Sequence, residues 1–170
     1  MKLHRIALAA AAALCCLLVS DRAQAQGIYL EIPGVPGEVV SPVFPNQIAV
    51  SALSWGGSKI CTGPLQVQDI NFTKSTDTAT TTLMSALRDG TVYPTITFRF
   101  ARSDDQVYQS YRLTNARLSS ISTGGAASDP RTTDSVSMTF SQALITYTFI
   151  FPSGKPGGTS STTIVSSACP

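Results

Sequence analysis

Alternation of apolar and polar residues with a period of two is the feature that most restricts the fold of this chain. Residues 95–102 give the clearest case, with Ile96, Phe98 and Phe100 separated by polar residues. Successive side chains of a β-strand point to opposite faces, so this run predicts a strand with one buried face. A chain made of several such runs folds as an antiparallel sandwich or barrel.

Other strands are expected wherever similar runs are bounded by turn residues. They cover residues 28–32, 48–55, 65–73, 107–122 and 135–151. The alternation slips near residues 68–69 and 141–144, which indicates bulges at both places. The Gly/Ser/Thr-rich tail from about residue 152 is expected to be open as far as Ile164.

One stretch, from about Thr78 to Arg88, has a helical pattern. Thr76, Asp77 or Thr78 can cap its start, and Gly90 suits its end. The expected inward face consists of Thr80, Leu83, Met84 and Leu87. The predicted fold is therefore mainly β, a two-sheet antiparallel barrel or sandwich with one flanking helix.

The N-terminus has the pattern of a cleavable export signal. After two basic residues, 14 apolar residues run from Ile6 to Val19. As a helix this run would cover about 21 Å, less than the ~30 Å hydrocarbon core of a membrane. An Ala-x-Ala site at residues 23–25 predicts cleavage between Ala25 and Gln26. We therefore expect a signal peptide over residues 1–25, a single domain over 26–170, and a periplasmic or secreted location.

Charge and histidine content narrow the function of residues 26–170. The leader holds three of the twelve basic and one of the ten acidic residues, so nine of each remain. A nucleic-acid binder would show a basic stripe, so neither nucleic acid nor, after cleavage, a membrane is an expected partner. The single histidine, His4, lies in the leader. Histidine-based catalysis and metal binding are thereby excluded, and we expect no catalytic residue, metal or cofactor.

Two cysteines follow the leader, Cys61 and Cys169. An exported protein with two cysteines most simply forms one disulfide, so a Cys61–Cys169 bond is predicted, with two free thiols as the alternative.

Weaker hypotheses concern acidic and aromatic residues. Glu31 and Glu38 would pair as acid and base across the first loop, and Trp55 would stack on a sugar.

Four segments occur in an order that resembles a known family. They are IYLEIPGVPGE (28–38), ALSWGGS (52–58), LQVQDINFTKSTDTATTTLMSALRDGTVYPTITFRF (65–100) and LTNARLSSISTGGAASDPRTTDSVSMTFSQALITY (113–147). In this order they resemble the haemolysin-coregulated protein family, Hcp, the ring-forming tube subunit of type VI secretion systems. The third segment is the most specific, because it joins a strand ending in Phe-Thr-Lys, a capped helix and a Tyr-Pro turn.

The resemblance implies an Hcp-like barrel that assembles as a homo-hexameric ring, with rings stacking into a hollow tube. Small effectors in the lumen and spike or sheath components are the implied partners. The chain departs from the family pattern in three places. The family lacks an export leader, it has a longer Gly-rich extension where this chain has only Gly56 to Pro64, and it lacks a tail ending in a cysteine like Cys169.

Two functions follow from these observations. The first is a structural, ring-forming tube subunit that is exported across the inner membrane. The alternative is a secreted binding module, monomeric or oligomeric, that reuses the fold without forming a tube. In the alternative, Trp55 and Tyr93 would bind glycans.

Overall fold

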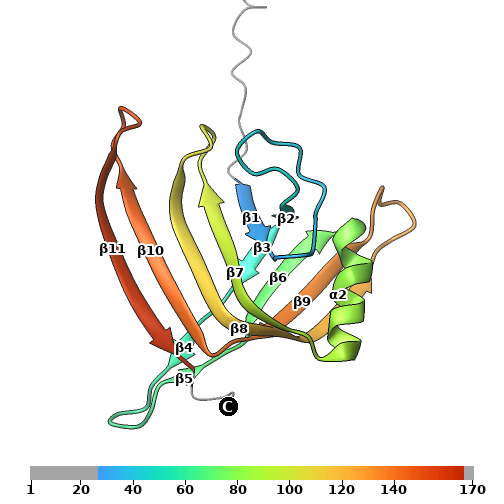
Figure 1. The fold of residues 1–170 in the computed structure, drawn as a ribbon, viewed down its shortest axis with the longest axis horizontal. Coiled ribbons are helices and arrows are strands. Elements are labelled where there is room, and N and C mark those ends of the chain that lie inside the picture. Colours follow the sequence, from blue (N-terminus) through green and yellow to red (C-terminus); the bar gives the residue numbers. More distant parts are fainter. Residues whose placement is uncertain (1–26, 167–170) are drawn as a thin grey trace, which may run out of the picture.

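A computed structural model describes residues 27–166, which form a long antiparallel sheet, a small two-stranded sheet and one helix (Figure 1). The elements in chain order are β1 (Gly27–Glu31), β2 (Ile48–Val50), β3 (Ala52–Ser54), β4 (Gly57–Ser58), β5 (Gln66–Val67), β6 (Ile70–Ser75), α2 (Thr78–Asp89), β7 (Val92–Ala101), β8 (Val107–Gly124), β9 (Thr133–Thr139), β10 (Gln142–Ile150) and β11 (Pro156–Val165). The predicted mainly β, antiparallel fold with one helix is confirmed. The leader, the expected Ala25–Gln26 cleavage site and Cys169 lie outside the described residues.

The long sheet closes on itself as a barrel. Its strands follow the order β2-β1-β7-β8-β9-β6-β3. The two end strands, β2 and β3, are separated in sequence only by Ser51, whose backbone N–H donates to the carbonyl of Thr73 on β6 (2.7 Å). The walls of the predicted two-sheet structure are thus joined by one continuous strand, which leaves the closed part without an open edge.

The inward-facing residues of the barrel fill its interior. Phe98 on β7 and Phe72 on β6 are almost completely buried, and their ring centroids lie 5.4 Å apart in an edge-to-face arrangement. Strands β7 and β6 are not neighbours in the sheet, so this contact crosses the barrel. It joins two walls that the backbone hydrogen bonds connect only through other strands.

Helix α2 begins and ends where the capping pattern indicates. Asp77 is the N-cap and accepts from the backbone N–H of Ala79 (3.0 Å), and Thr80 completes a capping box. Gly90 ends the helix with a φ of 63°. The buried face consists of Ala79, Thr80, Leu83 and Ala86. Met84, expected on that face, is instead 40% exposed, because the helix packs along the stripe that carries the two small alanines.

The two predicted slips in alternation are breaks between strands. β5 ends at Val67 and β6 begins at Ile70, while β9 ends before and β10 begins after residues 140–141. At the second break, the backbone N–H and the hydroxyl of Ser141 both donate to the carbonyl of Thr114 (3.0 Å each). This double contact holds the chain at the point where it leaves β9 and continues as β10 beside the first half of β8.

The prediction of an open tail is wrong for residues 156–165, which form strand β11. β11 pairs with β10 from Gln142↔Val165 to Ile150↔Pro156, and β10 pairs with the first half of β8. We call residues 142–165 the flange, because this hairpin extends the sheet beyond the closed barrel (Figure 1). Threonine-rich sequences are compatible with strands. The tail lacks an apolar alternation, and its strand is ordered by pairing with β10.

Candidate assembly surfaces

A buried ionic network joins β6, the start of α2 and β9. Lys74 is fully buried because it follows Ile70 and Phe72 on the inward face of β6. Its ammonium nitrogen lies 2.5 Å from Oδ1 of Asp77 and 2.9 Å from Oδ2 of the fully buried Asp134. The alternation along β6 could have revealed this lysine, and the phase of Asp134 with Val136 and Met138 could have revealed its partner.

Hydroxyl groups satisfy the carboxylate of Asp134. Thr80 donates to its Oδ2 (2.5 Å), while Thr123 and Thr76 donate to its Oδ1 (2.7 and 3.1 Å). Burial by itself would raise the pKa of Asp134. The hydrogen bonds from Thr80, Thr123 and Lys74 outweigh burial and hold the pKa below its ordinary value. Asp134 is therefore a charged structural group, held by donors on several elements.

The depressed pKa of Asp134 predicts acid sensitivity. A carboxyl whose folded pKa is lowered stabilises the fold above its unfolded pKa, about 3.9, and this stability is lost as the pH falls through the folded value. We expect the free energy of unfolding to decrease below about pH 4. Urea titrations at several pH values measure the decrease. The slope should be smaller in Asp134→Asn, and an equal slope in both proteins would contradict this role.

The two glycan-binding candidates do not share an exposed surface. Tyr93 is buried in the core, and burial raises the pKa of its phenol. Trp55 is half-buried between Tyr111 and Phe140, with ring centroids 5.9 Å away in each case. Its indole N–H donates to the carbonyl of Gln68 (3.1 Å). Tyr93 is therefore not available to stack on a sugar, and Trp55 is packed against two neighbouring rings.

The hypothesised acid–base pair of Glu31 and Glu38 is wrong, because each carboxylate is bound to a different arginine. Oε2 of Glu31 lies 2.6 Å from a guanidinium nitrogen of Arg99. Oε2 of Glu38 lies 3.3 Å from Arg131, and its Oε1 accepts from the backbone N–H of Thr78 (3.1 Å). The Glu31 contact joins the end of β1 to β7, and the Glu38 contacts attach the first loop to the start of the helix and to Arg131.

One exposed surface lies on the outer face of β3, β6 and β9. We call it the polar face; it consists of Ala52, Ser54, Asn71, Thr73, Ser135 and Ser137. Ser54 pairs with Asn71 and Asn71 with Ser137, whose hydroxyl donates to the Asn71 amide oxygen (2.5 Å). The side chains of the polar face are small and uncharged, so this surface carries no charge of its own.

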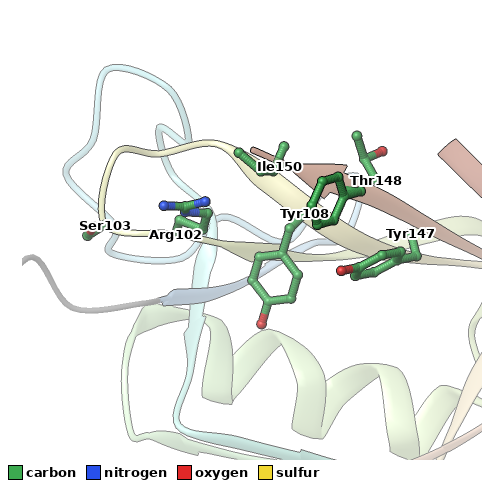
Figure 2. A pocket seen from close by; sticks show the side chains of 7 residues that line it. Arg102, Ser103, Tyr108, Tyr147, Thr148 and Ile150 are labelled. Atoms are coloured by element: carbon green, nitrogen blue, oxygen red, sulfur yellow. The ribbon is translucent and has the colours of Figure 1, made fainter. Parts of the chain in front are cut away.

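Another exposed surface is an aromatic hollow between the turn after β7 and the end of the flange. Its volume is about 440 Å³. Figure 2 shows Tyr108 of β8 and Tyr147 of β10 projecting to the same side of the sheet, away from Thr148 and Ile150. The other lining residues are Arg102, Ser103 and Phe149.

Cys61 is exposed in the turn of the β4–β5 hairpin, where it has a φ of 48°. This hairpin includes residues 57–64, where the family resemblance implied a longer Gly-rich extension. Strand β11 ends at the same end of the molecule (Figure 1), where the backbone N–H of Ser166 donates to the carbonyl of Ser141 (2.9 Å). Because Cys169 lies outside the described residues, its pairing with Cys61 stays a prediction.

Within residues 27–166, no helix is both long and apolar enough to cross a membrane. Together, the closed barrel, capped helix, projecting hairpin and uncovered flange define a structural class, a small antiparallel β-barrel with one flanking helix. The family described as "Type VI secretion system effector, Hcp" matches residues 29–147. The chain belongs to the Hcp family of type VI secretion, whose members are structural and are known to form oligomeric rings.

Individual relatives agree with this assignment. Protein hcp1 of Pseudomonas aeruginosa is 38% identical over 86 residues, which cover 49% of this chain and 53% of that protein. The chain thus spans about half the length of this curated relative.

Solved structures show the same fold. A structure described as a type six secretion system protein has a TM-score of 0.79 at 22% identity, covering 83% of this chain and 96% of that one. Hcp1 from Salmonella typhimurium has a TM-score of 0.72 at 21% identity, covering 83% and 95%. A type VI secretion effector from Yersinia pestis has a TM-score of 0.71 at 19% identity, covering 81% and 98%.

Proposed function

We propose that this chain is a tube subunit that assembles into a homo-hexameric ring. The observation that carries the proposal is the family match over residues 29–147, which covers all or most of every strand of the closed barrel. The polar face is compatible with it, because a surface of small uncharged side chains can line a lumen without binding charged cargo tightly. Stacked rings, with spike or sheath components as partners, complete the proposed assembly.

Native mass spectrometry of the purified protein at micromolar concentration tests the ring. The expected species has six times the mass of the monomer, and negative-stain images show rings with a central opening. A strictly monomeric species under these conditions would contradict the proposal.

We further propose that residues 1–25 direct export across the inner membrane and are removed, and that Cys61 and Cys169 then form a disulfide. The apolar run, the Ala-x-Ala site and the two remaining cysteines support export to the periplasm or beyond. The exposure of Cys61 supports the bond, because an exposed thiol is accessible to a partner cysteine.

Intact mass of the exported protein, after thiol alkylation with and without reductant, tests both steps. The expected mass begins at Gln26, with no alkyl group before reduction and two after it. Cys61→Ser is the matched control and should leave one thiol that alkylates without reductant. Two alkylated thiols in the unreduced protein would refute the disulfide, and a mass that includes the leader would refute cleavage.

A further inference from the structure

We propose that the apolar face of the flange is an interface between subunits and is covered by a second copy of this chain. The inference rests on the proposed ring and names the surface that forms it. This face consists of Ala143, Ile145, Tyr147, Phe149 and Phe151, which occupy alternate positions along β10 and its first turn residue.

The apolar face of the flange continues the face that is buried inside the barrel. Cross-strand pairs Ala143↔Leu113 and Ile145↔Tyr111 place these residues on the same side of the sheet as the buried Leu113. Along β10, burial then decreases from the fully covered Ala143 to Tyr147, which is 47% exposed. The sequence thus keeps a core-type pattern beyond the point where this single chain can cover it.

Three aromatic rings lie at the uncovered end. Tyr147, Phe149 and Phe151 are 47%, 45% and 47% exposed. The Phe149 and Phe151 rings stand edge to face at 5.0 Å, next to Gly157 of β11, where a Cβ would lie 2.9 Å from the Phe151 ring. The glycine leaves room for this ring pair. An ordered group of exposed aromatic side chains is typical of an interaction surface.

The same hairpin has an uncovered edge. Within the described residues, β11 pairs only with β10, so one side of a ten-residue strand has free backbone groups. Proteins commonly protect such edges with charged residues, yet residues 142–165 contain a single one, Lys155, in the turn. Low charge and exposed aromatic rings match the composition of interface cores.

A second copy fits this surface better than an unrelated partner. The family forms oligomeric rings, so each flange of the proposed assembly lies beside further copies of this chain. A cyclic ring requires a heterologous contact, in which one surface of each subunit meets a different surface of the next. The flange projects from one side of the barrel and thus supplies one of these two surfaces (Figure 1).

Phe149→Ser and Tyr147→Ser test the interface by native mass spectrometry over a dilution series. We expect each variant to raise the concentration needed for half-assembly at least about tenfold, because truncating an interface hot spot costs more than this factor. Met84→Ser is the matched control, because Met84 is 40% exposed but lies on α2, away from the flange. This variant should assemble into the oligomeric ring at the same concentration as the wild-type protein. Far-UV circular dichroism of the dissociated variants should match that of the wild-type protein.

The outcomes separate this inference from the proposed ring. A monomeric wild-type protein would overturn both. A wild-type ring that survives both substitutions with unchanged dilution behaviour would overturn the flange interface alone. If a variant does not fold, hydrogen exchange of the wild-type protein gives the answer: β10 and β11 amides should be protected in the ring and lose protection on dilution, and equal exchange in both states would overturn the inference.

Discussion

Replacing Lys74 with methionine is expected to lower the free energy of unfolding by about 3–5 kcal/mol, as breaking a buried ion pair generally does. Methionine keeps much of the apolar stem but removes the ammonium that lies between Asp77 and Asp134. The buried carboxylate of Asp134 would then face no cation. Urea unfolding at fixed protein concentration measures the loss, which is a large share of the 5–15 kcal/mol typical of a folded domain.

Arg88→Met is the matched control. Arg88 forms an ion pair with Asp89, but the two side chains are 75% and 53% exposed. Exposed pairs contribute about 0–1 kcal/mol, so this variant should be close to the wild-type protein. A double variant of Lys74→Met with Asp134→Asn should lose less than the sum of the single losses, because the two residues share one network. A loss below about 1 kcal/mol for Lys74→Met would contradict a stabilising role.

The network matters because α2 is weak by itself. Four of its twelve residues are threonine, which has a low helix propensity. The helix keeps its place because Thr80 connects it to both ionic partners, accepting from Lys74 (2.8 Å) and donating to Asp134 (2.5 Å). A polar cluster thereby attaches the helix to β6 and β9.

Local patterns predicted the barrel strands and the helix well. The alternation around Phe98 predicted β7, and Asp77 and Gly90 marked the ends of α2, because both signals depend on residues close in sequence. The prediction that Met84 lies on the inward face was wrong, because the helical pattern is compatible with more than one buried face. Contact with β8 decides between them, and that contact is not local.

Strand β11 could not be predicted from its local sequence. Its sequence is Gly-, Ser- and Thr-rich without apolar alternation, and its order comes from hydrogen bonds to β10. The exposure of Tyr147 and Phe149 was likewise not predictable. Their alternation indicated a buried face, but the barrel continues from β8 to β9, and this pairing leaves the flange outside it. For Trp55 and Tyr93 the reverse holds, since neighbours from other strands cover rings that lie near strand ends.

Phe98→Ala is expected to lower the free energy of unfolding by about 3–5 kcal/mol, the usual cost of truncating a buried phenylalanine. The phenyl ring of Phe98 is fully buried and meets Phe72 across the barrel, so its removal leaves a cavity between two walls. Phe98→Leu should cost less than about 1.5 kcal/mol, because it nearly conserves volume. Val40→Ala, at a fully exposed loop position, should change stability by no more than about 0.5 kcal/mol. Denaturant unfolding of the three variants gives the order, and an equal cost for Phe98→Ala and Val40→Ala would contradict a barrel held together by this contact.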